Sequence, residues 1–198
     1  EGGGPPAGIP LTSPEGQRLL RGATHAAAFP ALVSHFVTEL PGMCGPSTAA
    51  MVLNALGVPA PVSEEYSAPM FNMTEHYWEQ HNVLNSSCVR RVTTPYRGSI
   101  EQIAAIVACQ GIEVDVVEAA SSSPAAFREA LRAALGGAPR PALVAVNFAR
   151  RLVGQLPLDG HHSPVGAYDE RSDRVLVLDV ARYRHPPVWH DLARLFDA

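Results

Sequence analysis

The sequence lacks the features expected of a membrane-embedded or nucleic-acid-binding protein. Its longest apolar stretches, such as Ala142 to Val146 and Val175 to Leu178, are far too short to span a bilayer. It has no long basic run and a formal net charge of -4, so it offers no electrostatic footprint for DNA or RNA. These absences predict a soluble protein with neither a membrane nor a nucleic acid as partner.

Cysteine is also scarce. The chain has three cysteines, Cys44, Cys88 and Cys109, and none of them form a C-x-x-C pair. This spacing excludes a zinc ribbon and a thioredoxin-type redox pair, and it predicts no metal-ligand set. The odd number leaves at least one free thiol, while pairing of Cys88 with Cys109 stays open.

The sequence has enough apolar residues to form one hydrophobic core. The 198 residues are 46% hydrophobic, which suits a single domain. A Gly/Pro-rich start predicts a flexible segment over residues 1–10, followed by one folded domain over residues 11–198. The first residue is Glu1, not Met, which is compatible with a mature or trimmed form. The compartment, cytoplasmic or periplasmic and secreted, therefore stays open.

The order of the local patterns predicts an α+β fold, with a helical front half and an antiparallel sheet behind it. Caps, prolines and apolar spacing indicate the helices, and alternation of apolar and polar residues indicates the strands. The first expected helix begins at Ser13-Pro14, the second leads up to Phe36, and the third runs from Cys44 to Gly57. A fourth surrounds Tyr77 and Trp78, a fifth follows a Ser99/Gln102 capping box to Gly111, and a sixth runs from Ser123-Pro124 to Leu135. The expected strands are Ile112 to Glu118, Ala142 to Phe148, Ser163 to Tyr168 and Arg174 to Val180, with a hairpin at Asp169 to Asp173.

Cys44 is the first candidate catalytic residue along the chain. It follows the Pro41-Gly42 break and starts an apolar helix, where the helix dipole and unpaired N–H groups favour a thiolate and can hold an oxyanion. A buried structural cysteine is the alternative.

Two adjacent histidines, His161 and His162, lie at the mouth of a predicted strand after Gly160. Neighbouring strand residues point to opposite faces, so only one of the two rings can face a given cleft. Taken alone, the pair could equally be a solvated loop or a metal-binding element.

Asp179 ends the strand that the hairpin folds back beside these histidines. A carboxylate among apolar strand residues needs a hydrogen-bond partner, and an imidazole N–H is one. Capping of the following turn is the alternative. Cysteine, histidine and aspartate in this order, on these elements, predict a nucleophile, a base and its orienting acid.

At these residues the chain resembles the phytochelatin synthase family. The motifs are Cys44-Gly45 with Val52 to Leu56, His161-x-Ser163-Pro164-Val165, Leu178 to Tyr183, and Pro186-Pro187-x-Trp189, and the likeness begins near Leu11. The resemblance implies a papain-like fold, with a helical lobe that carries the cysteine packed on a sheet lobe that carries the histidine and the aspartate. It also selects His161, two positions before the Ser-Pro pair, over His162.

The resemblance implies a cysteine-nucleophile acyl-transfer enzyme acting on glutathione or a γ-glutamylcysteine peptide. Glycine is released to give a γ-glutamylcysteinyl thioester on Cys44, which water or a second glutathione resolves. Asn147, Arg150 and Gly160 match family positions near bound substrate. The chemistry needs no cofactor; activation by heavy-metal ions or a metal–thiolate substrate, and a homodimer, are compatible with the resemblance.

One family feature is missing. The family's oxyanion-hole glutamine precedes its cysteine, and here Thr38 and Glu39 occupy that stretch. We take Glu39 as the substitute; the alternative is a solvated Glu39, with Thr38 or backbone N–H groups completing the hole. Two other functions therefore remain: a papain-like cysteine peptidase or amidase acting on another peptide, and a non-catalytic thiol- or metal-binding relative.

Overall fold

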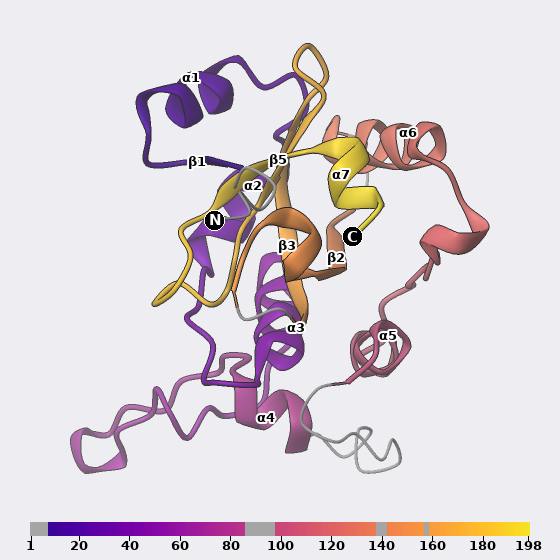
Figure 1. Ribbon diagram of the computed structural model, residues 1–198. Coiled ribbons are helices and arrows are strands. Elements are labelled where there is room, and N and C mark those ends of the chain that lie inside the picture. Colours follow the sequence, from indigo (N-terminus) through magenta and orange to yellow (C-terminus); the bar gives the residue numbers. More distant parts are fainter. Residues whose placement is uncertain (1–7, 86–97, 138–141, 157–158) are drawn as a thin grey trace.

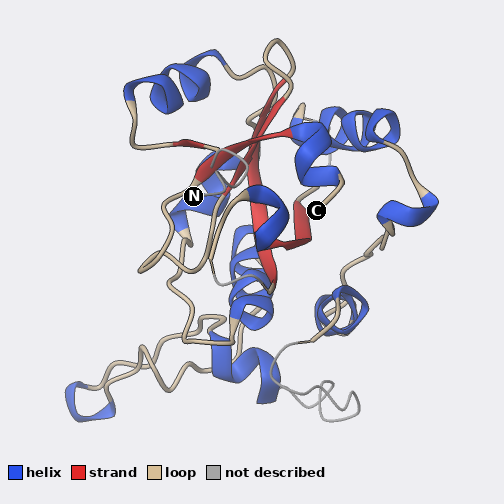
Figure 2. Ribbon diagram, in the orientation of Figure 1, coloured by secondary structure: helices blue, strands red, loops and turns tan. Residues whose placement is uncertain are grey.

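The computed structural model describes residues 8–85, 98–137, 142–156 and 159–198. Figures 1 and 2 show a central sheet with helices around it. The helices and strands, in chain order, are β1 (Ile9–Pro10), α1 (Pro14–Gly22), α2 (Phe29–Ser34), α3 (Cys44–Ala55), η1 (Pro69–Phe71), α4 (Gln80–Asn85), α5 (Ile100–Ala108), η3 (Ala119–Ser121), α6 (Pro124–Leu135), β2 (Val144–Ala149), η4 (Arg150–Val153), β3 (Gly160–Asp169), β4 (Arg174–Val177), β5 (Val188–Asp191) and α7 (Leu192–Phe196). The α+β class is confirmed.

Among the described residues the sheet has five strands in the order β1-β5-β4-β3-β2, and every neighbouring pair is antiparallel. β3 lies between β4 and β2, with His161 opposite Phe148 and His162 opposite Asn147 in the β2 register. The predicted hairpin joins β3 to β4. β3 is buried along nearly its whole length, so the histidines at its start are held in the most enclosed strand of the sheet.

Helix α3 is buried on two sides and belongs to two cores. Cys44 and Met51 pack in the larger core on the sheet, whereas Ala50 and Leu53 pack in a second core with Trp78 and residues of α4 and α5. Because helical residues three, four or seven apart share a face, these pairs mark opposite sides of one helix. In Figure 1, α3, α4 and α5 gather below the sheet, while α6 and α7 lie together at the upper right. α3 is thus the shared wall of the two halves.

Local cap signals explain where several of the helices begin. The Ser13 hydroxyl accepts from the Gly16 N–H at 3.0 Å, which starts α1 where it was predicted. The Ser99 N–H donates to the Gln102 side chain at 2.8 Å, which starts α5 through its capping box. Within the described part of the chain, none of the helices combines the length and apolar character that a membrane-spanning segment needs.

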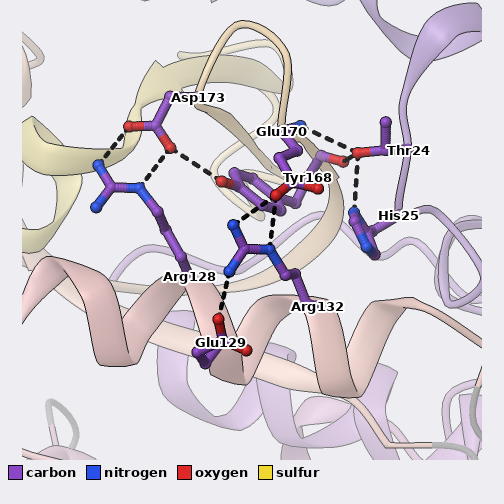
Figure 3. Close-up of polar contacts among 8 residues, drawn as sticks. All are labelled: Thr24, His25, Arg128, Glu129, Arg132, Tyr168, Glu170 and Asp173. Atoms are coloured by element: carbon purple, nitrogen blue, oxygen red, sulfur yellow. Dashed lines mark hydrogen bonds and ion pairs between the residues drawn. The ribbon is translucent and has the colours of Figure 1, made fainter.

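Ion pairs hold α6 against the hairpin between β3 and β4 (Figure 3). The Arg128 guanidinium donates two hydrogen bonds to the Asp173 carboxylate, at 2.9 and 2.6 Å, and the Tyr168 hydroxyl donates to the same group at 3.0 Å. Arg132 donates to Glu170 on the same hairpin. Asp173 itself has a positive φ of 52°, a conformation that aspartate tolerates in tight turns. The network fixes the turn of the hairpin against α6, and it therefore fixes where β4 begins.

Two sequence expectations need correction. Residues 112–118 form no strand: Ile112 and Val114 pack on the second core, but no neighbouring strand pairs with them. The helix expected around Tyr77 and Trp78 begins later, at Gln80, because the Glu79 carboxylate accepts the first free N–H groups of α4, at 2.7 and 2.9 Å.

The flexible segment expected over residues 1–10 stays a prediction. Ile9 and Pro10 form β1 and pair with Trp189 and Val188 of β5; residues 1–7 lie outside the described part. β1, β5 and α7 were not predicted at all.

His190 lies on β5 and is buried. Its side chain is 2% exposed, and its Nε2 atom has no hydrogen-bond partner among the described residues. Burial lowers the pKa of His190 to about 4; the charge of Asp179 opposes this shift, and the charges of Arg194, Arg150 and Arg174 add to it. The folded protein therefore holds this ring neutral at a pH where an unfolded chain would protonate it.

We expect His190→Phe to make the protein less sensitive to acid. Because the folded pKa is depressed, the unfolded state binds the extra proton, and stability is lost as the pH falls from about 6.5 to about 4. Between pH 7 and pH 4.5 the variant should lose roughly 2–3 kcal/mol less unfolding free energy than the wild type. Urea unfolding at the two pH values measures this difference. Equal losses in the two proteins would show that His190 is not responsible for acid sensitivity.

Candidate active site

Cys44 is the first residue of α3, and the turn before it sets its position. Gly42 has a φ of 85°, which favours glycine, and the Met43 N–H donates to the Leu40 carbonyl at 2.9 Å to close the turn. A Cβ on Gly45 would lie 2.4 Å from Ile103 Cδ1, so glycine lets α5 approach the start of α3. Cys44 is a free thiol and is 9% exposed, whereas Cys109 is disulfide-bonded and Cys88 lies outside the described residues. The free thiol thus sits at a helix N-terminus.

The ring of His161 lies between the thiol and Asp179. Its Nε2 is 2.9 Å from Asp179 Oδ1, which leaves Nδ1 for the Cys44 thiol, with which the side chain also forms a hydrogen bond. The Phe148 ring meets it edge to face, with centroids 5.7 Å apart. Burial alone would lower the pKa of His161, but the hydrogen bonds to Asp179 and Cys44 and the charge of Asp179 together raise it. The ring is therefore fixed in orientation and suited to holding a proton.

Asp179 lies just beyond β4 and is 1% exposed. Its two oxygens take a bidentate ion pair from Arg150, at 2.8 and 3.0 Å, and Oδ1 also accepts from the Ala181 N–H at 2.9 Å. Burial would raise the pKa of Asp179, but the hydrogen bonds from His161 and Arg150 outweigh it and hold the pKa well below its usual range. Asp179 is thus a permanently charged acceptor for His161.

The three residues expected near substrate differ in what their side chains do. Gly160 lines the pocket and begins β3. Arg150 also lines it, but the guanidinium is 2% exposed and bonded to Asp179 and to Gln155 Oε1 at 2.6 Å. Asn147 donates to His162 Nδ1 at 3.2 Å. The side chains of Arg150 and Asn147 therefore form hydrogen bonds with other side chains of the protein. The sequence analysis predicted neither of these contacts.

The ring of His162 lies near Gly45 and Gly98. Its Nε2 donates to the Gly98 carbonyl at 2.9 Å, and burial together with the charge of His161 lowers its pKa. With both ring nitrogens occupied by Gly98 and Asn147, His162 is a neutral, anchored neighbour, while His161 contacts the thiol and the acid.

Glu39 lies beside the thiol, not in solvent. It is 7% exposed, and one ligand atom of each of Glu39, Cys44 and His161 lies within 4.8 Å of the others. Its N–H donates to the Val180 carbonyl at 2.9 Å, and its Oε1 accepts from the Tyr183 hydroxyl at 3.2 Å. Burial raises the pKa of Glu39 despite the opposing charge of His161.

Thr38 points elsewhere: it is exposed and lines a separate pocket against α2 and residues 65–80. Gln80 bonds to the backbone on both sides of Glu39, accepting from the Leu40 N–H at 2.8 Å and donating to the Thr38 carbonyl at 3.2 Å. Tyr183 and Gln80 are thus supports for Glu39 that sequence reasoning missed. Tyr183 lay within a quoted motif, but nothing signalled Gln80.

A pocket of about 330 Å³ opens over these groups. Its lining residues carry a thiol, imidazoles and charges of both signs, and they are Glu39, Pro41, Gly42, Cys44, Gly98, Asn147, Arg150, Asp159, Gly160, His161, His162, Ala181, Tyr183 and Arg184. The arrangement is a thiol, imidazole and carboxylate in series at a helix N-terminus, the constellation that cysteine-dependent acyl-transfer enzymes use.

The comparisons with known proteins narrow this class. The family model for phytochelatin synthase matches residues 4–198, and the chain belongs to that family. It is 30% identical over 98% of its length to glutathione gamma-glutamylcysteinyltransferase 3 of Lotus japonicus, and 27% identical over 98% to glutathione gamma-glutamylcysteinyltransferase 1 of Arabidopsis thaliana. The Schizosaccharomyces pombe relative is 26% identical over 84% of the chain. The chain spans 37–41% of the length of these and the other curated relatives.

We predict that Arg150→Met strongly destabilises the fold, because it leaves the buried Asp179 charge uncompensated. The expected loss is about 3–5 kcal/mol of unfolding free energy, measured by denaturant titration. Arg151→Met, at the exposed neighbouring position, is the matched control and should stay within about 0.5 kcal/mol of the wild type. Adding Asp179→Asn to Arg150→Met should recover part of the loss. Equal stabilities of the two arginine variants would contradict the assignment.

Proposed function

We propose that this chain is a cysteine-nucleophile acyl-transfer enzyme that acts on glutathione. The observation that supports this best is the continuous series of contacts from the Cys44 thiol through His161 to Asp179 at the N-terminus of α3, in a chain of the phytochelatin synthase family. The proposal also takes the fold as papain-like, since a buried helix with the thiol at its start packs on the antiparallel sheet that carries the histidine and the aspartate.

The first half-reaction forms a thioester. His161 Nδ1 takes the thiol proton, and the Cys44 sulfur attacks the carbonyl carbon of the cysteinyl–glycine bond of glutathione. The imidazolium then gives its proton to the leaving glycine nitrogen as the C–N bond breaks. Asp179 stabilises the imidazolium, and Arg150 keeps Asp179 charged and oriented. The products are free glycine and a γ-glutamylcysteinyl thioester on Cys44.

The second half-reaction returns the free thiol. His161 removes a proton from water or from the α-amino group of a second glutathione, and the resulting attack on the thioester expels the Cys44 sulfur. Water gives γ-glutamylcysteine, and the amine gives the longer γ-glutamylcysteine peptide. N–H groups at the start of α3 are the donors that this proposal assigns to the oxyanion of each step.

The charges at the pocket suit this substrate. Exposed Asp159 and Arg184 both line it, so beyond Glu39 and the buried Arg150–Asp179 pair it offers a further acidic and a further basic group. A γ-glutamyl head carries an ammonium and a carboxylate, and both can be paired there. A peptidase acting on an ordinary peptide is the rival that the test must separate.

The test is mass spectrometry of the intact protein after incubation with glutathione. Wild type should gain a γ-glutamylcysteinyl adduct on Cys44 and release glycine, Cys44→Ala should do neither, and Cys109→Ala should keep most of the turnover. His161→Ala should lose far more turnover than His162→Ala, because only His161 joins the thiol to the acid. Glycine release by Cys44→Ala at the wild-type rate would overturn the proposal, and adducts from ordinary peptides alone would favour the peptidase.

We expect Glu39→Gln to raise the rate of thioester formation. An ionised carboxylate beside the thiol can only accept hydrogen bonds and repels an oxyanion, whereas an amide donates and its oxygen can still accept from Tyr183. One oxyanion donor is worth roughly 3 kcal/mol, so the gain could reach about a hundredfold.

The rate is measured as glycine release in buffer with a metal chelator, with the exposed Glu113→Gln as matched control. A Glu39→Gln rate equal to that of the control would place the carboxylate away from the developing charge.

A further inference from the structure

We infer that Glu39, Cys44 and His161 form a binding site for a divalent cation of the zinc and cadmium class. All three residues are buried, and their ligand atoms lie within 4.8 Å of one another. A carboxylate oxygen, a thiolate sulfur and an imidazole nitrogen are the ligand types that such ions take, often with three protein ligands and one open position.

The Glu39 carboxylate is the ligand on which the proposed cation site depends. Glu39 is 7% exposed, and its Oε2 atom has no hydrogen-bond partner among the described residues. A buried carboxylate oxygen without a partner is costly, and coordination of a cation would satisfy it. An amide at this position, as in the family's glutamine, would give a much weaker ligand.

The charge balance also favours a dication. The buried Arg150 and Asp179 neutralise each other through their bidentate pair, so neither compensates Glu39. With Cys44 as thiolate and Glu39 ionised, the three ligands carry two negative charges, which one divalent ion cancels. Binding releases the thiol proton to solvent.

The groups around the ligands are those of a metal site. His161 is held through its other ring nitrogen by the Asp179 carboxylate, which is the outer-shell contact that orients most metal-bound histidines. All three ligands line the pocket of about 330 Å³, which gives an entry path and room for water or a substrate thiol at the open position. Ligand atoms of a tetrahedral zinc site are roughly 3.3–3.8 Å apart, so the side chains need to close by only about 1 Å.

An ion at this site occupies the thiol and the base together. Its effect on the reaction would therefore be inhibition, and activation by metal would have to act through the substrate thiol or another part of the protein. This consequence rests on the proposed function; the binding itself does not.

Direct binding is the first test, in the absence of glutathione. Zn²⁺ affinity is measured by competition with a chromophoric chelator, and Co²⁺ reports thiolate ligation by its charge-transfer absorption. We expect one ion per chain, a Co²⁺–thiolate band that Cys44→Ser abolishes, and at least about tenfold weaker Zn²⁺ binding by Glu39→Gln. Glu113→Gln and His81→Ala, the latter in the other acidic–histidine group with Glu65 and Glu79, should bind like the wild type.

Alkylation of Cys44, followed by mass spectrometry, is the second test. Saturating Zn²⁺ should slow the modification at least tenfold in the wild type. Equal Zn²⁺ affinities for Glu39→Gln and the wild type, loss of binding in His81→Ala, or unprotected Cys44 at saturation would each overturn the site. If no thioester forms even with chelator present, the proposed function fails while the binding results still decide the site.

Discussion

The charged pair between Asp179 and Arg150 is the constraint on which the site and the end of the sheet both depend. Burying a carboxylate is costly, and here His161, Arg150 and the Ala181 N–H offset that cost together. The pair joins the segment after β4 to η4, and the Asp179 carboxylate also holds the ring of His161 in β3. The same contacts that stabilise the fold therefore orient the imidazole toward the thiol.

The position of the thiol follows from the second constraint, the burial of α3 on both sides. A helix that packs on a sheet with one face and on other helices with the opposite face cannot rotate without exposing one of the two cores. Its N-terminus is therefore placed rigidly against the start of β3. The Cys44 thiol meets His161 because two hydrophobic cores leave the helix one position, and the polar contact adds orientation to a distance already set by packing.

Signals that are local in the sequence predicted the structure well, and those that depend on distant partners did not. Caps and prolines act within one helical turn, so the starts of α1, α5 and α6 could be predicted. Residues 112–118 alternate like a strand, but a strand needs a partner, and none of the described strands pairs with them. Motifs in the sequence predicted Cys44, His161 and Asp179 as the catalytic residues. The contacts that hold the site in place, from Arg150 to Asp179 and from Gln80 to the backbone beside Glu39, join residues that are far apart in the sequence. No spacing rule connects Arg150 to a carboxylate 29 positions away.

The side chain at position 39 limits the chemistry that the proposed site can perform. The Glu39 backbone is fixed by Val180 and by Gln80, so the chain presents whatever side chain stands here to the thiol. An amide at this position could donate to an oxyanion but would coordinate metal poorly; a carboxylate reverses both properties. The proposed acyl transfer and the inferred cation binding would therefore compete for the same space around Cys44. The backbone around position 39 is the same in both cases. Whether the site favours acyl transfer or cation binding therefore depends on one atom of the side chain at position 39, the nitrogen of an amide or the second oxygen of a carboxylate.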